Sequence, residues 1–178
     1  MEVLEGAIVM RKRVIFTIGL ITFLLASFLT SKANAQTEES LTIGISYNQI
    51  MGYLDQYISM SKSSDVRGQP RYMGLTSDNL ATLEIIGNKK DVSQATLMIG
   101  IPNDAPKILV RNTGILLRFM KNVAPEWKSG SDWATSALGR VSSTDEPEEI
   151  IRGSKSIKLS LIKVLGIVFV TVKHKNAI

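Results

Sequence analysis

An apolar run near the beginning of this chain is the strongest constraint on its fold, because it indicates which residues are removed before the mature domain forms. Residues 11–13 are basic, residues 14–29 carry no charge, and Ala33 and Ala35 close the segment with small side chains. A basic, an apolar and a small-residue region in this order are typical of a secretory signal peptide, and we expect cleavage between Ala35 and Gln36. The run is shorter than the roughly 20 residues that a membrane-spanning helix prefers, so an uncleaved signal anchor is the less favoured alternative.

The basic cluster also indicates where the leader begins. Met10 stands directly before residues 11–13, whereas Met1 lies well upstream of them. The charges of a signal peptide usually lie within a few residues of its start. We therefore expect residues 1–35 to be a leader whose functional start is Met10.

The chain that remains is long enough for one domain. Removing residues 1–35 from the 178-residue chain leaves 143, which can bury a single core. We expect a polar spacer over residues 36–44, one domain over residues 45–174 and a tail over residues 175–178. The chain has no cysteine, so an exported domain must rely on core packing rather than on disulfides. A bacterial periplasmic or extracellular location fits this composition best.

The charge of the remaining chain gives no case for nucleic-acid binding. The leader holds four of the 21 basic and two of the 16 acidic residues, so the formal net charge falls from +5 to +3 without it. A nucleic-acid-binding domain normally carries a much stronger basic excess or a basic stripe.

The first half of the domain shows one helical pattern followed by three strand patterns. Ser46 and Gln49 have the spacing of a capping box, and apolar residues recur behind them at helical intervals, which predicts a helix over about residues 46–61. Residues 61–70 have the composition of a loop. Residues 71–76, 80–86 and 92–101 are typical of strands, and their short connections favour an antiparallel meander.

The second half predicts helices and then two strands. Asp104 and Pro106 form a helix-start pattern for a helix that runs to about Asn122, and a shorter helix is expected from Ser131 to Gly139. Residues 140–149 have the composition of a surface loop. Residues 156–163 alternate between apolar and polar side chains, and residues 167–173 are apolar on both faces, which indicates a central or doubly covered strand.

These elements predict an α+β fold in two layers. The order α-β-β-β-α-β-β favours an antiparallel sheet of about five strands with the helices on one face. This order resembles that of type III secretion chaperone-like domains, over roughly residues 45–174. The resemblance implies a small adaptor that binds a partner chain through its sheet or its helices. Such chaperones are generally cytoplasmic and acidic, whereas this chain carries a leader and is mildly basic.

No pattern in the chain predicts a catalytic site, a metal site or a cofactor site. His174 is the single histidine and lies beside lysines near the C-terminus, and the chain lacks the Gly-x-Ser-x-Gly pattern of hydrolase nucleophiles. It also lacks the glycine-rich phosphate-binding patterns, and the acidic residues 145–149 lack the spacing of a calcium loop.

Four residues are the best candidates for contacts with a partner. Trp127 and Trp133 lie six residues apart between two predicted helices, and tryptophan is enriched at recognition hot spots. Residues of this size also pack helices onto sheets, which is the alternative. Arg67 and Arg71 flank a glycine in a loop-like segment and could hold an anionic partner, although solvated loop arginines are common.

The expected function is therefore that of an exported, non-enzymatic binding or adaptor domain with a protein partner. The alternative is a domain that binds a small apolar ligand or a lipid in a cavity between its sheet and its helices. Contact with a membrane is expected only if the leader is not cleaved.

Overall fold

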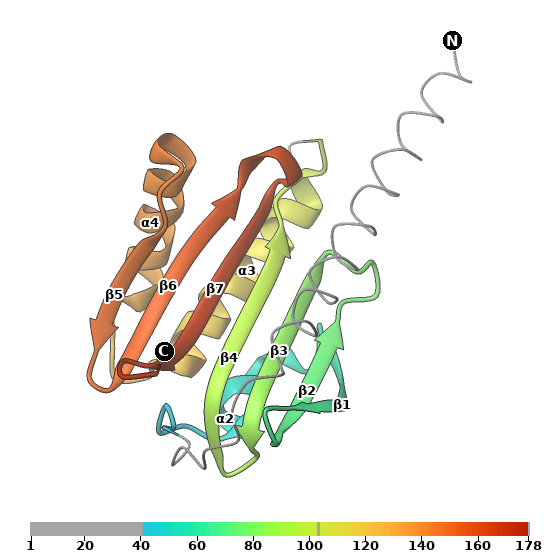
Figure 1. The fold of residues 1–178 in the computed structure, drawn as a ribbon. Helices are drawn as coiled ribbons and strands as arrows, with labels where there is room; N and C mark the ends of the chain where they lie inside the picture. The colour runs from blue at the N-terminus through green and yellow to red at the C-terminus, as the bar shows by residue number, and fades with distance from the viewer. Residues whose placement is uncertain (1–40, 103, 178) are drawn as a thin grey trace. The chain divides into compact units, whose positions relative to one another are not determined.

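Seven antiparallel strands form one sheet, and the helices lie together on one of its faces (Figure 1). A computed structural model describes residues 41–102 and 104–177; the predicted leader and spacer residues 36–40 lie outside the described part. The strands are, in chain order, β1 (Ser59–Val66), β2 (Gln69–Leu75), β3 (Ala81–Asn88), β4 (Asp91–Gly100), β5 (Glu148–Arg152), β6 (Lys155–Ile162) and β7 (Ile167–His174).

The helical elements cover the sheet from behind in Figure 1, and α2 packs on α3, α3 on β4, and α4 on β6. They are the α-helices α2 (Tyr47–Met51), α3 (Pro106–Val123) and α4 (Gly130–Thr144) and the 3₁₀ helix η1 (Gly52–Leu54). A second 3₁₀ helix, η2 (Lys163–Leu165), lies in the connection between β6 and β7 and has no buried residue. The predicted α+β class and the antiparallel sheet are confirmed.

The strand order is β1-β2-β3-β4-β7-β6-β5, so the last strand lies in the middle of the sheet. The four N-terminal strands form one meander, and the chain then crosses through α3 and α4 to the opposite edge. It returns inward from β5 to β7, which pairs with β4 along its length. This placement fits the apolar character of both faces of residues 167–173.

The core lies between the sheet and the helices. Register partners on the helix-facing side form two continuous apolar rows across β3, β4, β7 and β6 in which every side chain is fully buried. One row consists of Leu83, Leu97, Val170 and Leu159. Burial of one such side chain contributes about 1.5–3 kcal/mol, so these rows hold the two halves of the chain together.

The first helix, predicted over about residues 46–61, is much shorter in the structure. The capping box of Ser46 and Gln49 is present, but α2 ends at Met51 and η1 at Leu54. Gly52 has a φ of 38°, and a Cβ there would come within 2.8 Å of Asn122 Nδ2. The chain then enters β1, so residues 59–66 form a strand where the end of the helix and part of a loop were expected.

The sheet has seven strands, whereas the sequence predicted about five. The two strands that were not predicted are the edge strands β1 and β5. β1 consists mostly of serine and charged residues, and β5 is only five residues long. Edge strands are solvated on more sides than central ones, so they need no apolar alternation. Both segments therefore have the composition of loops.

The helix predicted to run to about Asn122 is confirmed as α3, which ends at Val123. The shorter helix predicted from Ser131 to Gly139 is confirmed in place but not in length. α4 continues past Gly139 to Thr144, because Val141 extends the buried side formed by Ala134 and Ala137. Asp145, with a φ of 64°, ends the helix in the left-handed conformation.

Candidate binding surface

The face of the sheet opposite the helices is the main candidate for contacts with a partner. We call it the open face, because no helix of residues 41–102 and 104–177 packs on it (Figure 1). Side chains point to it at every second position of each strand. Register partners place Thr96, Thr171, Lys158 and Glu149 in one row across it, and Gln94, Lys173 and Ser156 in the next.

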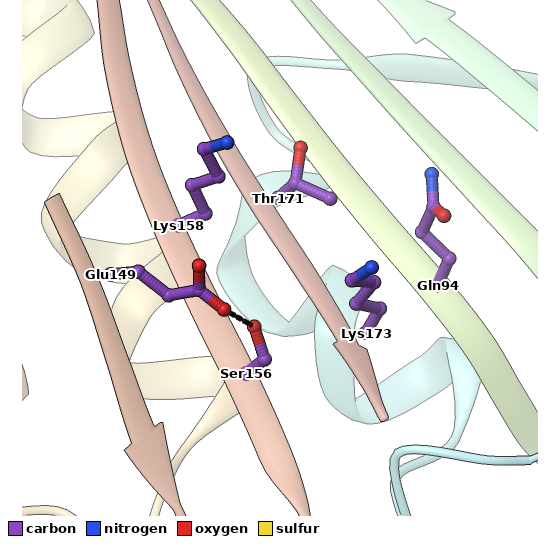
Figure 2. A pocket seen from close by; sticks show the side chains of 6 residues that line it. All are labelled: Gln94, Glu149, Ser156, Lys158, Thr171 and Lys173. Atoms are coloured by element: carbon purple, nitrogen blue, oxygen red, sulfur yellow. Dashed lines mark hydrogen bonds between the residues drawn. The ribbon is translucent and has the colours of Figure 1, made fainter. Parts of the chain in front are cut away.

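A polar hollow lies where these two rows meet, with a volume of about 310 Å³. Figure 2 shows its lining side chains on four adjacent strands, all projecting toward the same space. They are Gln94, Glu149, Ser156, Lys158, Thr171 and Lys173. Because the strands are held by the central ladder, the backbone beneath this polar hollow is fixed before any ligand arrives.

The polar hollow contains two lysines without an ionic partner among the described residues. Glu149 Oε1 accepts a hydrogen bond of 2.6 Å from Ser156 Oγ, and Thr171 Oγ1 lies 3.4 Å from Thr96 Oγ1. Within residues 41–102 and 104–177, neither Lys158 nor Lys173 forms an ion pair. The lining therefore carries two positive charges against one negative charge.

This arrangement can bind an anion more readily than it can catalyse a reaction. A lysine ammonium donates up to three hydrogen bonds, and carboxylates and phosphates are its strongest acceptors. Ser156 Oγ donates to Glu149, and no histidine lines the polar hollow to act as a base. His174 stands opposite Lys155 in the register, and its Nδ1 accepts from the Asn176 N–H at 3.2 Å.

Trp127 and Trp133, which are six residues apart in the sequence, lie next to each other in the fold. Their ring centroids are 5.5 Å apart, and both rings pack partly buried against the core. The Arg152 guanidinium lies 4.8 Å from the Trp127 centroid, and a Cβ on Gly130 would lie 3.2 Å from Trp127 Cε3. The pair thus joins the start of α4 to the β5–β6 hairpin.

An ion pair lies next to the two tryptophans. Lys155 Nζ is 2.8 Å from Glu126 Oε1, and the lysine side chain is 8% exposed. Burial alone would raise the pKa of Glu126, but the hydrogen bond from Lys155 and its charge lower that pKa below its usual value. The ion pair therefore anchors the segment that carries Trp127 to β6.

Arg67 and Arg71 do not form a common site. Arg67 is exposed in the β1–β2 turn with a φ of 51°, next to Gly68 with a φ of 74°. Positive φ at two successive residues is typical of a type I′ hairpin turn. Arg71 is only 2% exposed in β2, and its Nε donates to Glu84 Oε1 at 2.6 Å.

The four predicted residues lie toward opposite edges of the sheet. The two arginines belong to the β1–β2 hairpin, whereas the two tryptophans pack beside β5 and β6. Sequence reasoning missed the polar hollow, although its signal was present. The polar side chains of residues 156–163 and 167–173 alternate with the buried ones, but only the register places them next to each other.

The polar hollow does not match the cavity that an apolar ligand would need. Its lining is polar and lies on the open face, whereas the expected cavity would lie between the sheet and the helices. In that layer the large side chains Phe119, Leu83 and Leu97 are fully buried.

No protein-family model, curated protein or solved structure matches this chain. In the part of the chain that the structure describes, no helix has both the length and the apolar character needed to cross a membrane. The same residues contain no group of three or more histidine, cysteine, aspartate or glutamate side chains placed to hold a metal ion.

Proposed function

We propose that this protein is an exported, non-enzymatic binding or adaptor domain that holds an acidic segment of a partner protein against the open face of its sheet. The observation that carries this proposal is the pair Lys158 and Lys173 in the polar hollow, both without an ionic partner among the described residues. The predicted leader supports export, and the polar lining favours a protein partner over the apolar-ligand alternative.

Positive charge and a rigid backbone both favour the binding of an acidic segment at the polar hollow. Two ammonium groups on adjacent strands can be contacted by carboxylates of one extended acidic segment, and Thr171 and Gln94 offer further polar groups. Each solvent-exposed ion pair contributes about 0.2–1 kcal/mol, so binding through two of them is weak and salt-dependent. An adaptor that must release its partner fits this range.

The test is fluorescence anisotropy of the purified protein with a labelled oligoglutamate peptide, and an oligoglutamine peptide of equal length as the neutral probe. We expect the oligoglutamate peptide to bind and its affinity to fall steeply with salt. The variant Lys158→Gln/Lys173→Gln should weaken this binding by about tenfold, as the loss of two such pairs predicts.

The matched control is Lys107→Gln/Lys175→Gln, which removes the same charge from exposed positions outside the polar hollow. It should leave the affinity within about twofold, apart from the small general effect of net charge. Equal weakening by both double variants, or equal binding of both peptides, would overturn the assignment of the site.

A further inference from the structure

The two free edges of the sheet differ in their protection against pairing with another strand. In β1, Lys62 and Asp65 form an ion pair at 3.8 Å, and the register with β2 shifts between Ser63 and Val66. A lysine on an edge strand and a bulge both discourage the addition of a further strand. The β1 edge is therefore a poor template for pairing.

The edge formed by β5 has neither a lysine nor a bulge, and its protection is limited to its short length and its charged side chains. β5 pairs with β6 in an unbroken register, contains no lysine or proline, and leaves 55% of Ile151 exposed. Figure 1 shows β5 at the end of the sheet, with β6 on its inner side. No strand of residues 41–102 and 104–177 pairs with its outer side. Its outward N–H and C=O groups are a template for another strand.

We propose that β5 pairs antiparallel with β5 of a second copy of this chain, which joins two sheets into one continuous sheet in a symmetric dimer. Residues directly opposite each other in such a pair lie on the same face. Glu148, Ile150 and Arg152 share the helix-facing side of β5, so they must match one another across the two-fold axis. This inference concerns assembly and does not depend on the proposed function.

Charge selects the register. An axis at Ile150 places Glu148 opposite Arg152 of the second copy, and symmetry repeats that pair. An axis at Glu149 would instead set two carboxylates opposite each other, and an axis at Ile151 would set Arg152 opposite Ile150 of the second copy. Opposite charges in directly opposed positions stabilise an antiparallel pair and like charges destabilise it, so the axis at Ile150 is favoured.

Contacts within one copy already hold the side chains of Glu148 and Arg152 on the helix-facing side of β5. Glu148 Oε1 accepts from Arg140 Nε at 2.8 Å, and the Arg152 guanidinium lies over the Trp127 ring. Their conformational freedom is therefore reduced before the copies meet, which lowers the entropic cost of pairing. A five-residue edge buries little area, so the dimer should be weak and concentration-dependent.

Two single charge reversals test both the dimer and its register by sedimentation velocity of the purified protein, from about 1 µM to about 1 mM. Glu148→Arg sets arginine opposite arginine twice, and Arg152→Glu sets glutamate opposite glutamate twice. Each variant alone should dissociate at a concentration at least about tenfold higher than that of the unmodified protein. An equimolar mixture of the two restores opposite charges at both pairs and should recover the dimer.

Lys62→Glu, which reverses a charge on the protected β1 edge, should leave self-association unchanged. Circular dichroism and tryptophan fluorescence confirm that each variant is folded. A protein that stays monomeric over the whole concentration range overturns the proposal. A dimer that both reversals leave intact, or that the mixture fails to recover, overturns the β5 register. Peptide binding is measured separately, so either proposal can fail without the other.

Discussion

Asn112 shows how a single polar side chain positions a helix on this sheet. It is fully buried in α3, and its Nδ2 donates to the carbonyl oxygens of Leu80 and Gly100 at 3.1 and 2.7 Å. Arg111 donates to its Oδ1, and the same arginine forms an ion pair with Asp78 at 2.7 Å. One amide group thus satisfies two carbonyls near the ends of β3 and β4 and fixes the rotation of α3.

We predict that Asn112→Ala lowers the free energy of unfolding by about 2–3 kcal/mol, because it leaves buried polar groups unsatisfied and opens a small cavity. Urea unfolding followed by tryptophan fluorescence measures the change. The control is Asn176→Ala at an exposed position, which should alter stability by less than about 0.5 kcal/mol. An equal effect of both substitutions would contradict the bracing role of Asn112.

At the scale of elements, the attachment of β1 depends on the absence of a side chain on β2. A Cβ at Gly74 would meet Met60 Sδ and would come within 2.7 Å of both Ile58 Cγ2 and the Ser59 carbonyl oxygen. Gly139 in α4 is the opposite case, since nothing lies within 4 Å of a Cβ built there. The two glycines therefore predict opposite effects for the same chemical change.

Gly74→Ala should destabilise the fold by about 1–3 kcal/mol through overpacking, and hydrogen exchange should accelerate first in β1. Gly139→Ala should stabilise it by up to about 1 kcal/mol, because alanine has the higher helix propensity. Thermal and urea unfolding measure both changes. If the two variants shifted stability in the same direction, the packing argument for Gly74 would be wrong.

At the scale of the whole molecule, the β4–β7 ladder joins the two halves of the chain. Seven register pairs, from Gln94–Lys173 to Gly100–Ile167, connect strands that are far apart in the sequence. Such long-range pairing forms only after a large loop has closed, so no local sequence pattern predicts it. Once formed, it contributes to the cooperativity of folding because it joins the two halves. The polar hollow is built across this ladder.

The predicted signal peptide can be tested at the same scale. We expect the protein recovered from an envelope or culture fraction to begin at Gln36, as measured by intact mass and N-terminal sequencing. The first described backbone contact from this end of the domain is the Ile43 N–H to the Val92 carbonyl oxygen at 2.8 Å, which cleavage after Ala35 leaves in place. Recovery only of the full-length chain in the membrane fraction would indicate the signal anchor instead.

Local patterns were enough for much of the fold. Ser46 and Gln49 predicted the start of α2, Pro106 the start of α3, and the alternation of residues 156–163 predicted β6. Each of these signals lies within a few residues, because capping, proline geometry and strand alternation are properties of neighbouring positions. β1 and β5 lack such signals, since an edge strand is specified by its partner rather than by its own composition.

The sequence by itself determined the antiparallel α+β class and the apolar side of the strands and helices that form the core. Only the tertiary structure decided which polar residues meet. Register brought Lys158, Lys173 and Glu149 to one polar hollow and buried Arg71 against Glu84. Sequence alternation gives the face on which a side chain lies, but its neighbours on that face depend on strand order and register, which long-range packing sets.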